Sequence, residues 1–181
     1  MPRLVALVGM PGSGKSVATA IFVSNGFQKI YFGDLTFEKL QEEGLEVNEK
    51  NERLMRERLR AEHGMSAYAK LSIPKIERLL KKGDVVIESM YSWEEYLVLK
   101  EKFPYLEVMA IYSPPQLRAK RLAVRPHRPL SESEVRSRDH SQIEKLQQAG
   151  PIAMADVTVV NTGSEEELKK EVEKYIDGKK A

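Results

Sequence analysis

The side chains and spacing best suited to chemistry stand near the start of the chain, in the run Gly9-Met10-Pro11-Gly12-Ser13-Gly14-Lys15-Ser16. This run matches the pattern G-x-x-x-x-G-K-[ST] at every position. Its glycines let the backbone turn so that successive N–H groups point at phosphate oxygens. Lys15 can reach the β- and γ-phosphates of a nucleotide, and the Ser16 hydroxyl is a ligand for magnesium. The run therefore predicts a loop that binds a nucleoside triphosphate, ATP or GTP, together with Mg2+.

The elements on either side of this loop agree with the motif. Arg3–Val8 is almost entirely apolar, as expected for a central strand buried on both faces. A helix is expected from about Lys15 to Ser24, where Asn25-Gly26 would end it. A helix start behind the glycines adds the positive end of its dipole to the phosphate site. A glycine-rich turn without a function would not require a buried strand before it and a helix after it, so both elements favour a phosphate-binding loop.

Beyond the loop, short β-rich runs alternate with longer helical patterns, which predicts an α/β fold with a parallel sheet and crossover helices. Four further strands are expected at 28–32, 84–87, 105–112 and 156–160. Serines followed by glutamates predict capped helices after Ser92, Ser131 and Ser164. Asp34 is expected to cap the helix 35–43, Pro74 to kink or break the helix 65–82, and Gly150-Pro151 to break the helix that starts after Ser131.

Composition limits the classes of function. The 181 residues suit a single domain, and the absence of cysteine excludes disulfides, thiolate nucleophiles and Cys-ligated zinc. A net charge of +2, from 29 basic and 27 acidic residues, argues against a nucleic-acid partner. The longest apolar run, Leu4–Val8 into Gly9-Met10, is too short to span a membrane, and no signal peptide is apparent. We expect a cytoplasmic protein, either a monomer or a homodimer.

Motifs that are missing narrow the class of phosphate-loop protein. Guanine-nucleotide switches carry D-x-x-G and N-K-x-D, and transporter ATPases carry a glycine-rich signature between loop and acidic strand; neither occurs here. These absences favour small-molecule kinases. The order Ser113-Pro114-Pro115, Arg118, Arg121, a basic segment, and Ala155-Asp156 leading to Asn161 resembles dephospho-CoA kinases. The whole chain resembles nucleoside monophosphate kinases, in particular adenylate kinase-related archaeal proteins.

This resemblance implies a three-layer P-loop kinase fold. Its five-stranded parallel sheet has the order 2-3-1-4-5 with helices on both faces, and its sites lie at the carboxyl ends of the strands. Acceptor-binding helices at about 34–82 and a lid at about 124–148 would belong to a single domain, 1–181. The resemblance also implies that ATP, bound with Mg2+, is the phosphoryl donor.

The acceptor site is expected around Asp34, Arg60 and Glu88. Asp34 follows the second strand and can act as a helix cap, in substrate binding, or as both. One helix is crowded with Arg53, Arg56, Arg58 and Arg60, and a guanidinium fork on it can match the geometry of a phosphate. Among the four arginines, the resemblance implies that Arg60 binds the acceptor's phosphate. Glu88 ends the third strand, where related kinases often have an Asp-Gly pair. It can hold a magnesium-bound water or accept a proton, and the alternative is a plain surface glutamate.

A second basic group is expected to act as a lid. Arg118, Arg121 and Arg125 recur at helical spacing and would share a face, and Arg121 and Arg125 resemble the catalytic lid arginines of the kinases. The alternative is a solvated basic helix. Arg138 and Asp139 either reach back to the site or form a local pair. Thr162, in Asn161-Thr162-Gly163, stands where the relatives hold adenine, although Asn and Gly also favour a simple turn.

The expected activity is ATP- and Mg2+-dependent phosphoryl transfer to a small nucleotide-type acceptor. A nucleoside monophosphate such as AMP is the first candidate and dephospho-CoA the second. A nucleotide-binding regulatory protein with little turnover is the alternative of another class, supported by Glu88 in place of the usual Asp. An ATPase that acts with RNA or DNA would need a continuous basic surface, which the interleaved glutamates oppose.

Overall fold

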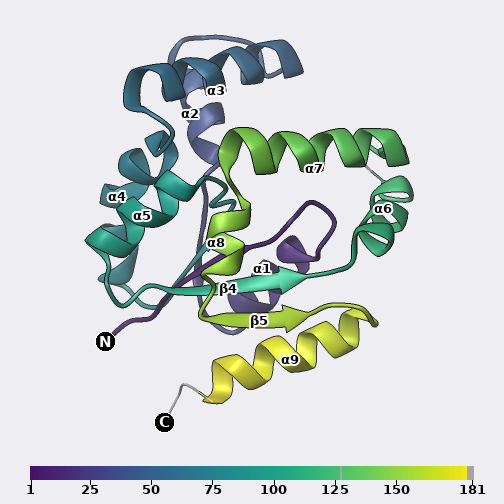
Figure 1. Cartoon of the computed structure of the whole chain (residues 1–181). Coiled ribbons are helices and arrows are strands. Elements are labelled where there is room, and N and C mark those ends of the chain that lie inside the picture. Colours follow the sequence, from purple (N-terminus) through teal and green to yellow (C-terminus); the bar gives the residue numbers. More distant parts are fainter. Residues whose placement is uncertain (127, 179–181) are drawn as a thin grey trace.

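A computed structural model describes residues 1–126 and 128–178. Five strands form one parallel sheet in the order β2-β3-β1-β4-β5 (Figure 1). Their bounds are β1 Leu4–Val8, β2 Gln28–Tyr31, β3 Val85–Glu88, β4 Glu107–Tyr112 and β5 Val157–Val160. The predicted strand order and all five strands are therefore confirmed, with ends shifted by one or two residues.

The central strand β1 is apolar because it has no solvent-exposed face. All of its residues are buried, and it pairs with β3 on one side and β4 on the other. Leu4, Ala6 and Val8 face one hydrophobic cluster, whereas Val5 and Leu7 face a second cluster on the opposite side. This alternation places helices on both faces, as predicted.

The helices divide between the two faces. One face is covered by α1 (Lys15–Ser24) and α9 (Glu165–Gly178), which bury Phe22 and Val172 against it. The other face is covered by α4 (Ala67–Leu80), α5 (Trp93–Lys102) and α8 (Ala149–Ala153). Figure 1 shows α9 and α7 on opposite sides of β4 and β5.

Four further helices extend beyond the sheet. A pair formed by α2 (Asp34–Glu42) and α3 (Glu49–His63) follows β2. A second pair, α6 (Pro115–Ala123) and α7 (Glu132–Leu146), follows β4. The first pair and α4 lie within 34–82, where acceptor-binding helices were predicted, and α7 lies within 124–148, where a lid was predicted, whereas α6 precedes that segment.

Helix starts follow the local sequence where a serine precedes a glutamate by three residues. The Ser92 and Ser131 hydroxyls accept bonds from the N–H groups of Glu95 and Glu134, and these glutamates return bonds to the cap backbone. Ser164 and Glu167 make the same reciprocal pair. The three predicted caps are therefore confirmed.

Two local expectations were wrong, and of the two alternatives given for Pro74, a kink or a break, the break is excluded. Asp34 is not a cap, because Gly33 is already helical and Asp34 is the first residue of α2. Pro74 does not break α4, which continues from Ala67 to Leu80 around it. Gly150 and Pro151 do not end α7; the helix stops at Leu146, Gln147 adopts a left-handed conformation, and the Gly-Pro pair lies inside α8.

No helix in the described part of the chain is both long and apolar enough to cross a bilayer. His127, in the predicted basic segment 125–129, lies outside the described residues.

Candidate functional site

The predicted phosphate loop lies at the carboxyl end of β1 and borders a cavity of about 420 Å3. We call this the loop cavity. It is lined by residues of the loop, the ends of β2 and β3, and the segments before and within α7, namely Pro11, Gly12, Lys15, Ser16, Lys29, Tyr31, Glu88, Ser89, Tyr91, Leu122, Arg125, Arg138 and Gln142. Most of these side chains are polar, as suits a bound triphosphate.

Glycine is required in the loop for steric reasons. Gly9 and Gly14 have φ angles of 147° and 104°, which side-chain-bearing residues avoid. A Cβ atom on Gly9 would collide with the Ile111 carbonyl oxygen, and one on Gly14 with the Asn161 amide. The backbone of the loop therefore packs so closely against β4 and the segment after β5 that no Cβ atom fits at these two positions.

Side chains from distant segments hold the loop carbonyls. Gln148 Nε2 donates to the Gly9 carbonyl at 3.0 Å, Arg118 to the Pro11 carbonyl at 3.1 Å, and Asn161 Nδ2 to the Ser13 carbonyl at 2.8 Å. A carbonyl engaged on the protein side leaves the neighbouring peptide N–H groups available to phosphate oxygens. The conformation of the loop is thus fixed by contacts with distant parts of the fold.

Lys15 is the first residue of α1 and lines the loop cavity. Its Nζ donates to the carbonyls of Gly9 at 2.6 Å and Met10 at 3.1 Å. Burial of the ammonium is the largest effect on Lys15 and lowers its pKa to about 8, against an opposing contribution from Glu88. A cation held in this desolvated position is stabilised by an incoming anion.

Glu88 ends β3 and meets the loop, as predicted. Its side chain is buried, and Oε1 accepts a hydrogen bond from Ser16 Oγ at 2.9 Å. Its other oxygen, Oε2, pairs with Lys29 Nζ at 2.7 Å. A hydroxyl and an ionised carboxylate side by side are the hard oxygen donors that magnesium or its bound waters prefer.

The three arginines predicted to share a face separate in the structure. Arg118 is buried and forms a two-pronged ion pair with Asp139 of α7, at 2.9 and 2.7 Å. Arg121 donates to Ser113 and to the Asn161 carbonyl, and it does not line the loop cavity. Arg125 lies beyond the end of α6, which explains why it leaves their common face, and it alone of the three lines the loop cavity.

A second cavity, of about 310 Å3, opens beside the first between β2, α2, α3 and α7. We call this the helix cavity. The two cavities share one wall, which is made of Tyr31, Ser89, Tyr91, Arg138 and Gln142. A ligand in the helix cavity would meet a ligand in the loop cavity at this shared wall.

Arg60 lines the helix cavity, where it was expected to bind the acceptor. Its guanidinium lies 5.5 Å from the centre of the Tyr68 ring, and the Tyr68 hydroxyl is bonded to Thr36 at 2.7 Å. The buried Nε of Arg60 has no hydrogen-bond partner in the described part of the chain. An unsatisfied buried donor on a cation is suited to an anionic ligand.

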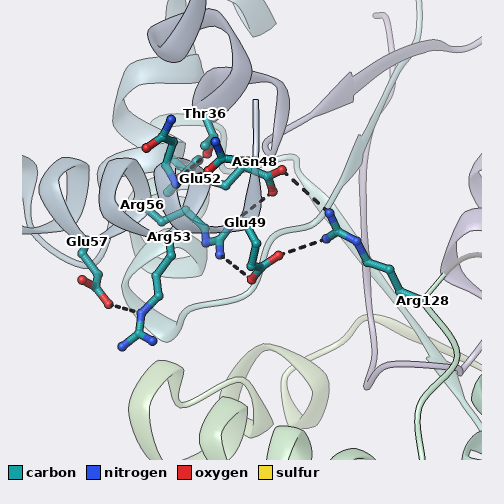
Figure 2. Close-up of polar contacts among 10 residues, drawn as sticks. Thr36, Asn48, Glu49, Glu52, Arg53, Arg56, Glu57 and Arg128 are labelled. Atoms are coloured by element: carbon teal, nitrogen blue, oxygen red, sulfur yellow. Dashed lines mark hydrogen bonds and ion pairs between the residues drawn. The ribbon is translucent and has the colours of Figure 1, made fainter. Parts of the chain in front are cut away.

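Acidic residues of α3 close the helix cavity toward the segment after α6. Arg128 approaches Glu49 at 3.2 Å and Glu52 at 3.9 Å, and Arg56 approaches the same two carboxylates (Figure 2). Glu52 is buried, whereas Glu49 is exposed. Most of these pairs are long, and the exposed ones contribute little to stability.

Several predicted site residues are not among those that line the two cavities. Asp34, Arg121 and Thr162 line neither cavity, so their roles stay predictions, and the loop residues Gly9, Met10, Ser13 and Gly14 are also absent from both linings. The pattern also did not single out Lys29, Gln142 or Gln148, which bring polar groups to the site from β2 and from the far end of the chain. Nothing in their local sequence distinguishes them, because only the tertiary packing brings them to the loop.

Comparisons with known proteins agree with this geometry. A family model described as an AAA domain, a class of P-loop protein, matches residues 5–147. A UPF0200 protein of Thermococcus kodakarensis is 36% identical over 96% of both chains.

Three solved structures show the same fold at low identity. TT1252 from Thermus thermophilus is 20% identical and covers 99% of both chains with a TM-score of 0.68. Shikimate kinase from Bacteroides thetaiotaomicron is 13% identical and covers 98% of both chains with a TM-score of 0.63. Dephospho-CoA kinase from Campylobacter jejuni is 19% identical, covers 97% of this chain and 96% of its own, and has a TM-score of 0.56. The chain therefore belongs to the UPF0200 family and has the fold of the P-loop kinases.

Proposed function

We propose that this protein transfers the γ-phosphoryl group of ATP to a nucleoside monophosphate such as AMP. The observation that carries the proposal is the pairing of two adjoining cavities. One contains the phosphate loop, and the other presents the unpaired buried Nε of Arg60. A donor triphosphate and an acceptor phosphate bound in these cavities would meet at the shared wall.

On the donor side, the loop N–H groups and Lys15 bind the phosphates. Burial lowers the pKa of Lys15 to about 8, because the ammonium is poorly solvated in the folded protein. An anionic ligand bound beside Lys15 would stabilise this charge. Arg125 and Arg138 line the same cavity and can meet charge that develops on the transferred group. Alignment and charge compensation are the main demands of this reaction.

The residues present fit magnesium bound to the donor. Ser16 Oγ would be a direct ligand, and Glu88 would hold a metal-bound water through the oxygen that faces Ser16. No group of three or more His, Asp or Glu side chains in the described residues could hold a metal alone. Magnesium would therefore take its other ligands from phosphates and water, where it neutralises phosphate charge.

The shared wall favours a phosphate acceptor over a hydroxyl acceptor. An attacking hydroxyl must lose a proton to a base, whereas a phosphate oxygen is already ionised at neutral pH. None of the five residues of the shared wall is acidic. Glu88, the carboxylate nearest to Ser16, has both oxygens engaged, by Ser16 and Lys29. This argument ranks a nucleoside monophosphate above dephospho-CoA.

A coupled ADP-release screen tests the proposal with AMP, dAMP, CMP, dCMP, UMP, GMP and dephospho-CoA as acceptors. We expect one monophosphate to raise turnover above the rate with ATP alone. Arg60→Ala should then raise the KM for that acceptor by about 10- to 100-fold, because a charge-assisted bond to phosphate is lost. The KM for ATP should not change.

Arg53→Ala is the matched control, because Arg53 lies on the same helix but is exposed and paired with Glu57. It should leave both KM values unchanged. If no acceptor raises turnover while ATP still binds, the protein is a nucleotide-binding regulator and the kinase proposal is wrong. Stimulation by dephospho-CoA alone would reverse the ranking of acceptors.

A further inference from the structure

Ser89 has a backbone conformation that its residue type disfavours. It follows Glu88 at the end of β3 with a φ angle of 73°, in the left-handed region that non-glycine residues rarely enter. Serine lacks the tolerance for this region that Asn and Asp have. A strained residue at such a position indicates that the side chain has a use.

The surrounding structure imposes this conformation from both sides. Before Ser89, β3 is paired with β1 and β2 up to Glu88. After it, the N–H groups of Tyr91 and Ser92 donate to Glu95 Oε2 at 2.7 and 3.0 Å, and Ser92 Oγ donates to the Met65 carbonyl at 3.0 Å. A glycine would accept the same backbone path without strain. The backbone alone therefore does not explain the serine.

The Ser89 hydroxyl belongs to a cluster on the shared wall. Its Oγ lies 3.0 Å from the Tyr91 hydroxyl, and Tyr31 lines the same wall. Burial is the larger effect on both tyrosines and raises their pKa values, so both phenols keep their protons at neutral pH. Ser89 itself is 4% exposed. In the Ser89–Tyr91 pair one hydroxyl donates to the other, so the pair leaves one neutral O–H available to a ligand.

Across the same wall stand groups that a ligand can satisfy. The Arg138 side chain makes no ion pair or hydrogen bond within the described residues. Burial raises the pKa of Tyr91 against the opposing charge of Arg138, and burial followed by the charge of Arg138 lowers the pKa of Arg125, so the guanidinium of Arg138 lies near both. The buried Gln142 Oε1 also has no hydrogen-bond partner within the described residues, but as an acceptor it suits an N–H or O–H of a ligand and not an ionised phosphate. Neutral donors opposite a free guanidinium are suited to a phosphate group that must be oriented as well as bound.

We propose that Ser89 and Tyr91 form a positioning pair, in which one hydroxyl donates to the other and the remaining O–H donates a hydrogen bond to the acceptor's phosphate where the two cavities meet. This role rests on the proposed function, because it assigns the orientation of the acceptor to these hydroxyls and its charge neutralisation to Arg60 and Arg138. Ser89 keeps its strained backbone because glycine would remove the hydroxyl that orients the acceptor.

The test compares Ser89→Gly, Ser89→Ala and Tyr91→Phe with the native protein. The probe is di(adenosine) pentaphosphate with Mg2+, which carries two adenosines on one phosphate chain and spans a donor and an acceptor site. Calorimetry measures its Kd and that of Mg-ATP, and thermal unfolding measures Tm. We expect each variant to bind the probe about tenfold more weakly, as loss of a hydrogen bond to a charged group implies. Mg-ATP should bind equally to all four proteins.

Thermal unfolding separates the hydroxyl from the backbone. Ser89→Gly relieves the left-handed strain and should have a Tm at or above that of Ser89→Ala, which loses the hydroxyl but keeps the strain. Native-like probe affinity in both Ser89 variants would overturn this inference and leave the proposed function standing. Weakened binding in Ser89→Gly but not Ser89→Ala would also overturn it, because backbone stiffness would then be responsible. If the native protein binds Mg-ATP but not the probe, the proposed adenylate acceptor fails and the inference fails with it.

Discussion

Removal of the Arg118 guanidinium offers the sharpest test of how the fold supports the phosphate loop. Arg118 donates to the Ser113 carbonyl at 3.2 Å, to the Pro11 carbonyl at 3.1 Å, and to both oxygens of Asp139 at 2.9 and 2.7 Å. The side chains of Arg118 and Asp139 are only 5% and 13% exposed. Truncation would leave a nearly buried carboxylate without its cation, together with two carbonyls that lose a donor.

The expected loss follows from that burial. Breaking a buried ion pair by removing one partner costs about 3–5 kcal/mol. Because Asp139 keeps some contact with solvent, we expect Arg118→Ala to lower the free energy of unfolding by about 3 kcal/mol. Arg118→Lys keeps the charge but not the planar fork, so it should lose about half as much. Arg118→Ala should also weaken Mg-ATP binding, since the Pro11 carbonyl is no longer held.

Urea unfolding followed by the fluorescence of Trp93, the single tryptophan, measures these changes. Lys120→Ala is the matched control, because Lys120 is an exposed cation on the same helix, and it should change stability by less than about 0.5 kcal/mol. The double variant Arg118→Ala/Asp139→Ala should recover part of the loss, since it removes the stranded charge. A loss below about 1 kcal/mol in Arg118→Ala would refute the reasoning.

Two further predictions concern Lys15 and Arg138. Burial lowers the pKa of Lys15 from 10.5 to about 8, so its charge disfavours the folded state below pH 8, and this penalty disappears as pH rises toward 10.5. Lys15→Met should therefore abolish turnover, yet in urea unfolding at pH 7 it should be at least as stable as the native protein. The difference in stability between the two proteins should narrow by pH 10. A large loss of stability in Lys15→Met at pH 7 would contradict this prediction. Arg138→Ala should lower kcat by about 10²- to 10³-fold with little change in the KM for ATP, as expected for a group that meets developing charge. Arg136→Ala, two residues away, exposed and paired with Glu132, should behave like the native protein in the same assay, and equal kcat values for both variants would remove Arg138 from the reaction.

The arginines that follow β4 show what could not be predicted from the sequence. Helical spacing placed Arg118, Arg121 and Arg125 on one face, yet α6 ends at Ala123, and only Arg118 pairs with Asp139 although Arg118 and Arg121 both donate to Ser113. Which arginine is buried depends on Asp139, 21 positions away, and local periodicity cannot reveal such a partner. The sequence left two interpretations of Arg138, a local pair with Asp139 or a role in the site. In the structure Asp139 pairs with Arg118, and Arg138 lines both cavities.

The phosphate-loop motif and the five strands could be predicted from the sequence alone, whereas the strand order 2-3-1-4-5 was predicted from the family resemblance. Glycine spacing, an unbroken apolar strand and a following helix are local properties, so Gly9–Ser16 could be read without knowing its neighbours. The tertiary structure alone decided what surrounds the loop. Gln148 and Asn161 reach its carbonyls from the far end of the chain, and Ser89 meets Tyr91 at the shared wall in a conformation its residue type disfavours. Contacts between segments so far apart in sequence depend on the packing of the whole sheet and its helices, which no local pattern encodes.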